Sequence, residues 1–308
     1  MRNISQEELN KILKEHELWL KREGGKCADL SDVDLRCANL SNADLRYADL
    51  KRVNLKGAYL RRTNLGDADL ENANLECADL RFADLECANL KYANLEDVNF
   101  KYVDLSNANL GKANLSNADL KHANLVCTDL RYADLRGADL RDANLKYGDL
   151  RYANLEYADL RFANLKYANL SNVNLRDANL KYADLRYGNL EYVKTNIHTI
   201  GYNLACPKKG SFIGYKKANG CIIKLLIPED AKRSSATTTK CRTNKAKVLD
   251  IENIETGEKV EEIRSNYDNN FIYRVGKIVY VDNFDDDRWN ECSTGIHFFV
   301  NKENAIKY

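Results

Sequence analysis

The sequence lacks an excess of charge of either sign, because 47 Lys and Arg residues stand against 46 Asp and Glu residues in 308. The formal net charge of +1 gives no global attraction to nucleic acid or to an anionic membrane. No apolar run approaches the roughly 20 residues of a membrane span, and the N-terminus lacks the apolar core of a signal peptide. We therefore expect a cytoplasmic protein without a membrane partner.

Metal-type CxxC spacing is also absent around the five cysteines that lie between residues 26 and 193, which are Cys27, Cys37, Cys77, Cys87 and Cys127. The chain has nine cysteines, an odd number that leaves at least one unpaired within the chain. Free thiols in a reducing compartment are the expected state. The sequence predicts no metal site and no cofactor.

A five-residue period dominates what is present. Leu recurs at every fifth position from Leu30 to Leu190, with Phe100 as the substitute, which makes 33 consecutive repeats. A small residue, usually Ala, stands two positions before each central Leu, and Asp or Asn stands between them except at Tyr59. A period of five fits neither the 3.6 of a helix nor the 2 of a flat strand. We expect the Leu and Ala side chains in a core and the other three positions facing water.

Runs such as Ala43-Asp44-Leu45-Arg46-Tyr47 and Ala138-Asp139-Leu140-Arg141-Asp142 resemble the pentapeptide-repeat family. The resemblance implies a mainly β fold, a right-handed quadrilateral parallel β-helix in which four repeats form one coil. Residues 20 apart would then stack about 4.8 Å from each other, and about eight coils would make a rod roughly 40 Å long. Such a fold predicts a binding or structural protein and no enzyme.

Three parts are expected along the chain: an N-terminal capping helix in 1–25, the β-helix in 26–193 and a small α+β domain in 194–308. Ser5 and Glu8 form a capping-box pattern that predicts a helix over 5–23, with His16 packed on its apolar side. In the last part we expect strands at 221–227, 247–254, 271–281 and 296–300 and a helix at 302–307.

One outer face of the β-helix differs from the others when positions 20 apart are sorted into columns. What we call the basic column consists of Arg61, Arg81, Lys101, Lys121, Arg141, Arg161 and Lys181, and the neighbouring aromatic column contains Phe82, Tyr102, Phe162 and Tyr182. Cations beside aromatic rings can bind a macromolecule, with a protein as the first expectation and nucleic acid as the alternative. The same face carries Asp79, Asp119, Asp139 and Asp159, so an ordinary solvated wall stays open as the second interpretation.

A topoisomerase-binding DNA mimic is a known role in the family, and it requires a strongly acidic rod. Residues 26–193 contain 23 Lys and Arg against 26 Asp and Glu, and no loop interrupts the repeats. The sequence therefore disfavours this role.

The last part offers three candidate sites, each with a plainer interpretation. The basic stretch 232–247 could hold phosphates or form a mobile solvated loop. The acidic stretch 282–287 lacks the glycine and the distal glutamate of a calcium loop. Cys292 and His297 could support nucleophilic chemistry or could simply stabilise the fold.

The tail also carries the segments Gly214-Tyr215-Lys216, Lys240-Cys241-Arg242 and Gly295-Ile296-His297-Phe298-Phe299. Together with the lead-in from Trp19 to Gly25 and the repeats, this tail resembles proteins encoded by bacteriophages or prophages of low-GC bacteria, and the tail itself resembles a domain of unknown function in those proteins. The resemblance implies a viral or prophage origin, and for a virus the host cell cytoplasm, but it implies no activity.

Overall fold

The computed structural model of the chain describes residues 1–202, 205–207, 209–290 and 293–308. They divide into two units, Met1–Ile200 and Gly201–Tyr308. The first unit extends beyond residue 193, where the five-residue pattern ends, because Lys194 and Ile200 still form parallel bridges with Asn174 and Asn179. Among the described residues, no helix has the length and apolar character needed to cross a membrane.

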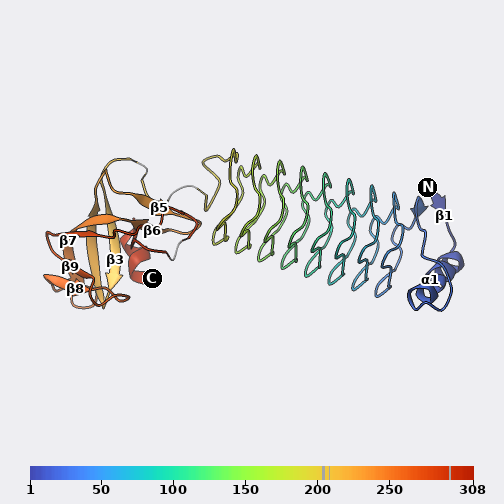
Figure 1. The fold of residues 1–308 in the computed structure, drawn as a ribbon, viewed down its shortest axis with the longest axis horizontal. Coiled ribbons are helices and arrows are strands. Elements are labelled where there is room, and N and C mark those ends of the chain that lie inside the picture. The colour runs from blue at the N-terminus through green and yellow to red at the C-terminus, as the bar shows by residue number, and fades with distance from the viewer. Residues whose placement is uncertain (203–204, 208, 291–292) are drawn as a thin grey trace. The chain divides into compact units, whose positions relative to one another are not determined.

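Parallel pairing at a spacing of 20 residues builds the first unit. From Asp29 with Asp49 to Asn174 with Lys194, the residue before each central Leu or Phe forms a β-bridge with the residue 20 positions later. At Leu110 the backbone N–H donates to Asp129 O at 2.7 Å, and two residues later Lys112 N–H donates to Arg131 O at 2.9 Å. Figure 1 shows the resulting stack of coils. The expected parallel β-helix with a 20-residue coil is confirmed.

The interior of the stack contains the central Leu residues and the small residues, as expected. Leu110 is fully buried, and Phe100 is accommodated with no exposed surface. Thr63 and Thr128 take the place of Ala without leaving a polar group unpaired, because their hydroxyls donate to the carbonyls of Leu40 and Leu105 at 2.9 and 2.8 Å. The interior is therefore closely packed and its few hydroxyls are satisfied.

The second residue after each central residue adopts a left-handed backbone conformation. From Asp32 to Tyr192 these residues have φ between 52° and 66°, although most of them are not glycine. Such a conformation is disfavoured by about 1–2 kcal/mol for a residue with a Cβ atom. Here a hydrogen bond in the stack fixes it, as where Tyr102 N–H donates to Lys121 O at 3.1 Å. The repeat thus places each of these side chains at a corner of the coil.

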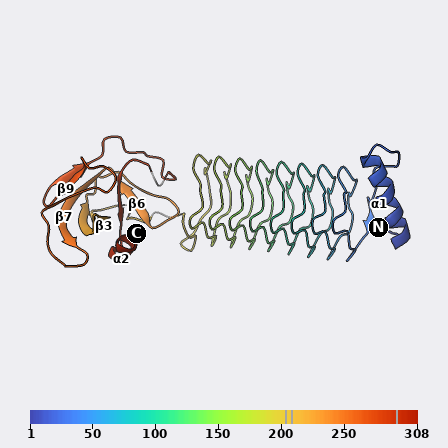
Figure 2. The same ribbon diagram turned by 90° about the horizontal axis from the view of Figure 1, so that it is seen from below.

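Helix α1 (Gln6–Leu20) precedes the repeats and ends three residues before the predicted limit. It begins at the predicted cap, since Ser5 Oγ accepts the N–H of Glu8 at 3.1 Å. His16 is fully buried, and its Nδ1 accepts the N–H of Ala28 at 3.0 Å. Figure 2 shows α1 beside the first coil. Next to it, β1 (Arg2–Asn3) pairs in parallel with β2 (Val33–Asp34).

The second unit contains a seven-stranded antiparallel sheet with the order β10-β7-β4-β3-β11-β6-β5. Its strands are β3 (Phe212–Ala218), β4 (Cys221–Ile227), β5 (Arg233–Ser235), β6 (Lys240–Thr243), β7 (Lys245–Asn253), β10 (Ile278–Tyr280) and β11 (Ile296–Phe299). Two further strands, β8 (Glu262–Arg264) and β9 (Ile272–Arg274), pair with each other, and α2 (Lys302–Lys307) ends the chain. The core includes Ile223, Leu225 and Phe298.

Strand β4 and helix α2 occupy the predicted residues, but the single strand expected over 271–281 is wrong. Gly276 has φ +79°, and Lys277 N–H donates to Arg274 O at 3.1 Å, so a turn divides the segment. Its halves, β9 and β10, belong to different sheets. The interpretation of 232–247 as a mobile loop is also wrong, because this segment forms β5, β6 and the start of β7.

Candidate functional site

Most cations of the basic column are paired with carboxylates of their own face. The salt bridges, at 2.5–3.1 Å, join Arg81 to Asp79, Lys101 to Asp119, Lys121 to Asp139, Arg141 to Asp139 and Arg161 to Asp159. The sequence-predicted residues therefore do lie in line, but five of the seven already have an anionic partner. This geometry is the one expected for the solvated-wall interpretation.

The pairing of the arginines follows from the local turn, whereas Lys101 and Lys121 pair with an Asp of the next coil. Asp159 Oδ1 accepts the backbone N–H of Arg161 at 3.2 Å, which holds both side chains on the same side of the coil. The guanidinium then donates from Nε to Oδ1 at 2.9 Å and from Nη2 to Oδ2 at 2.6 Å. At the equivalent pair, hydrogen bonds from Arg81 hold the pKa of Asp79 below its usual value. The forked guanidinium face is thus occupied within each Asp–x–Arg repeat.

Cationic side chains slightly outnumber anionic ones on this face. Arg61 and Lys181 form no salt bridge with any described residue, and Tyr59 and Asn179 stand at the position of the local Asp. Between residues 59 and 182, the three outer columns of the face contain eight Lys and Arg and five Asp. The face is weakly basic, and its unpaired cations lie near its two ends.

The aromatic column forms two stacks of parallel rings. Phe82 and Tyr102 have centroids 5.1 Å apart, and His122 continues this stack at 4.8 Å from Tyr102. Phe162 and Tyr182 form the second stack at 5.0 Å. The four residues Phe82, Tyr102, Phe162 and Tyr182 are 47–56% exposed. The rings are therefore held in place by each other while half of their surface is open to a partner.

Similar ladders occur on other faces of the coils. Tyr147, Tyr167 and Tyr187 stack at 5.1 and 4.9 Å, and Tyr132 stacks on Tyr152 at 4.9 Å. Lys146 Nζ lies 4.7 Å from the centre of the Tyr147 ring. Stacked rings thus belong to the general architecture of the coils, and these two ladders provide an internal comparison for the aromatic column.

The basic stretch of the second unit uses its arginines to hold backbone segments. Arg233 donates hydrogen bonds to the carbonyls of Pro207, Gly210, Pro228 and Glu229. Arg242 is 2% exposed and donates to the carbonyls of Asp285, Asp287 and Thr294. These two guanidinium groups fix loops and are not displayed for phosphates.

Two carboxylates of the acidic stretch 282–287 also have partners within the second unit. Asp285 Oδ1 accepts the N–H of Asp287 at 2.9 Å, and Asp286 forms a salt bridge with Lys232 at 2.8 Å. No group of three or more His, Cys, Asp or Glu residues suited to a metal ion occurs in the described part of the chain. Cys292 lies outside the described residues, so its pairing with His297 stays a prediction, while His297 itself lines a pocket.

Comparisons with known proteins agree with the geometry. Five segments that together span residues 26–191 match the family described as "Pentapeptide repeats (8 copies)", and residues 202–305 match a "Family of unknown function (DUF5758)". A search of curated proteins found no match.

Solved structures of pentapeptide repeat proteins are similar to the repeat region. HetL, involved in heterocyst differentiation regulation in the cyanobacterium Nostoc sp. strain PCC 7120, is 36% identical over 54% of this chain and 86% of its own, with a TM-score of 0.22. Full-length QnrB1, a plasmid-mediated fluoroquinolone resistance protein, is 20% identical over 55% and 84%, with a TM-score of 0.32. A thylakoid-lumen protein of Arabidopsis thaliana is 32% identical over 28% and 59%, with a TM-score of 0.27.

Proposed function

The chain belongs to the pentapeptide-repeat family, and from this premise we propose that it is a non-catalytic scaffold whose aromatic column binds a macromolecular partner, in the first place a protein. Arg61 and Lys181, the cations without a salt bridge at the two ends of the basic column, orient the bound partner. The observation that carries the proposal is the pair of half-exposed ring stacks on a face whose central charges neutralise each other.

The finer description of the scaffold belongs to the same proposal. We infer a right-handed helix of about eight coils, since 33 repeats at four per coil give that number. We also infer that α1 caps the first coil. The hydrogen bonds from Ala28 N–H to His16 Nδ1 and from Lys26 N–H to Glu15 O support this role. A covered end would prevent strand-like association of two stacks.

A protein fits the aromatic column better than a nucleic acid does. A base inserted between two rings would need van der Waals contact on both of its sides, which requires a ring separation of about 7 Å. The separations within the two stacks are 4.8–5.1 Å, so neighbouring rings of a stack leave no room for an intercalated base. The paired guanidinium groups are also not available for bidentate phosphate contacts. A protein partner needs neither a gap between the rings nor a free guanidinium group, because its side chains can contact the exposed surfaces of the rings.

The proposal is tested by removing the rings and measuring which proteins the chain captures. The variant carries Phe82→Ser, Tyr102→Ser, Phe162→Ser and Tyr182→Ser. The matched control removes four stacked rings elsewhere through Tyr132→Ser, Tyr152→Ser, Tyr147→Ser and Tyr167→Ser. We expect quantitative mass spectrometry of affinity captures to show partners lost from the first variant and kept by the control.

Circular dichroism and thermal unfolding of both variants verify that the coils stay intact. If the two variants capture the same proteins as the unmodified chain, the aromatic column is not the binding face. Equal losses from both variants would point to a general effect of ring removal on the coils and would also contradict the proposal.

A further inference from the structure

Lys216 in β3 occupies a position where the strand pattern calls for an apolar residue. Gly214, Lys216 and Ala218 alternate toward the buried side of the strand, and Ala218 is part of the core. Lys216 is only 8% exposed, whereas its neighbour Lys217 is exposed. A lysine at an inward strand position breaks the local rule for core residues, and such breaks concentrate at functional sites.

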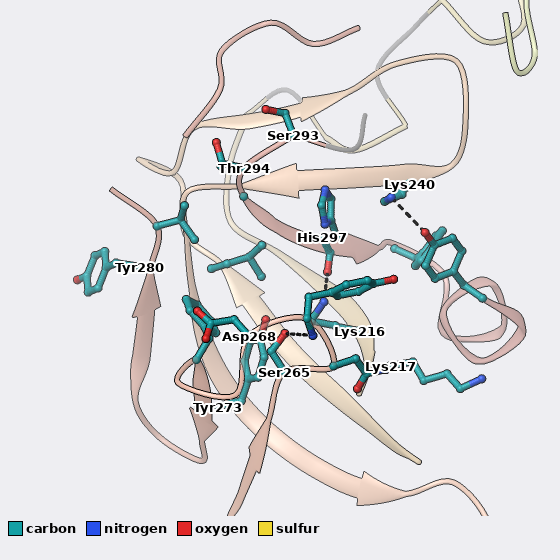
Figure 3. Close-up of a pocket in the computed structure, with 18 of the residues that line it drawn as sticks. Lys216, Lys217, Lys240, Ser265, Asp268, Tyr273, Tyr280, Ser293, Thr294 and His297 are labelled. Carbon is teal, nitrogen blue, oxygen red and sulfur yellow. Dashed lines mark hydrogen bonds between the residues drawn. The ribbon is translucent and has the colours of Figure 1, made fainter. Parts of the chain in front are cut away.

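The side chain of Lys216 reaches a pocket of about 820 Å³ inside the second unit (Figure 3). Its Nζ donates to the carbonyl of His297 in β11 at 3.4 Å and lies 5.9 Å from the centre of the Tyr273 ring in β9. The volume is in the range of pockets that enclose small organic ligands. The ammonium group thus lies at the wall of a ligand-sized space.

No carboxylate balances this ammonium group among the described residues. Asp268, the one Asp or Glu among the described residues that line the pocket, accepts the backbone N–H of Asn270 at 2.9 Å and forms no salt bridge with them. The other lysines of the wall are also cationic: Lys217 donates to Ile306 O at 3.0 Å, and Lys240 donates to Tyr308 Oη at 3.2 Å.

Burial, with a smaller contribution from Lys240, lowers the pKa of Lys216 to about 8. A buried cation without an anionic partner is unfavourable, and an anionic ligand would remove that penalty. The remaining titratable groups on the wall include His297, Tyr273 and Tyr280, and none of them supplies a carboxylate.

We propose that this pocket binds a small organic anion, with its carboxylate or phosphate group on Lys216 and its apolar body against Tyr273, Phe271 and Phe299. The three aromatic residues line the same pocket as the ammonium group. The site combines one charged anchor with an aromatic wall, which is the usual division of roles in small-molecule pockets. It lies wholly within the second unit and does not depend on the function of the repeats.

Binding of an anion should draw a proton onto Lys216. An anion beside the ammonium group raises its pKa, so a site that is largely deprotonated above pH 8 takes up a proton when the ligand binds.

Calorimetric titration of the full chain with benzoate and with phenyl phosphate, in two buffers of different ionisation enthalpy at pH 8.5, measures both affinity and proton uptake. We expect saturable binding of at least one probe at millimolar or lower concentration, with proton uptake. Benzyl alcohol, which keeps the ring and lacks the charge, should bind at least about tenfold more weakly.

Lys216→Met should reduce the affinity for the anionic probes by about tenfold or more, because it removes the charge and keeps an apolar side chain of similar length. Lys224→Met, which replaces an exposed lysine of the adjacent strand β4, should leave the affinity unchanged. Absence of binding by both probes, or equal binding by the Lys216→Met variant, overturns the proposal. If that variant fails to fold, the comparison of the anionic probes with benzyl alcohol decides, and equal affinity for the charged and uncharged probes overturns the proposal.

Discussion

At the scale of single residues, the Asp or Asn before each central Leu can form a hydrogen bond within its own turn and another to the neighbouring coil. Its side-chain oxygen accepts the backbone N–H of the residue two positions later, as Asn164 Oδ1 does from Lys166 at 3.2 Å. Asn can also donate to the coil below, as Asn164 Nδ2 does to Asn144 Oδ1 at 3.1 Å. A carboxylate can perform only the accepting task. The two residue types are therefore equivalent for the turn but not for the ladder between coils.

We predict that Asn164→Ala lowers the free energy of unfolding by about 1–2 kcal/mol, because it removes both hydrogen bonds at a half-buried position. Asn164→Asp should cost less, since the carboxylate keeps the turn contact and lies beside Lys166. Urea denaturation followed by circular dichroism measures the difference between the variants. Equal losses in the two variants would show that the turn contact contributes nothing.

At the scale of elements, α1 is joined to the first coil through a histidine that must be neutral. His16 Nδ1 can accept the N–H of Ala28 only when it carries no proton. Burial is the main cause that lowers the pKa of His16 below its usual 6.5. The unfolded chain therefore binds more protons than the folded chain in this range. The contribution to stability is present above pH 6.5 and is lost as the pH falls below it.

We predict that hydrogen–deuterium exchange of the α1 amides, corrected for the intrinsic exchange rate, increases when the pH falls from about 7.5 to about 5.5. The repeats beyond the first coils should keep their protection. His16→Asn provides the control, because its Oδ1 takes the position of Nδ1 and can accept the N–H of Ala28 at both pH values. Unchanged protection of α1 in the unmodified chain at the lower pH would falsify this role of His16.

Also at this scale, the second unit shows where strand patterns mislead. The apolar residues of 271–281 suggest one strand, but Gly276 allows a turn that sends β9 and β10 to different sheets. The sequence does not indicate strand β3, because Lys216 and Lys217 interrupt its apolar pattern. Lys216, which interrupts the apolar pattern of β3, also lines the pocket.

At the scale of the whole molecule, the distribution of charge decides which roles fit. The rod carries nearly equal numbers of both signs, and local Asp–x–Arg pairs neutralise many of them in place. Such a surface does not produce the extended negative potential of a DNA duplex.

We predict that the protein does not inhibit DNA supercoiling by a type II topoisomerase, even at a large molar excess. The measurement is a gyrase supercoiling assay with the full chain, and a strongly acidic DNA-mimic protein of the same family serves as the positive control. Inhibition that persists after deletion of residues 201–308 would contradict the prediction and would assign a topoisomerase to the rod.

The sequence by itself determined the five-residue period, the Leu and Ala interior, Ser5 as the N-cap of α1, and the residues of β4 and α2. These features depend on local patterns, since a five-residue unit or a cap is complete within a few residues. The coil of four repeats that the family resemblance implies also placed the basic and aromatic columns in line, because residues 20 apart then stack.

Only the tertiary structure decided what these columns offer. The pairing of Lys101 with Asp119 and of Lys121 with Asp139 joins neighbouring coils, and the separation of the stacked rings is set by the coil spacing. The pocket depends on contacts between distant strands, since Lys216 meets the carbonyl of His297 81 residues away. Side-chain contacts of this kind depend on the order of strands in the sheet, which no local pattern specifies.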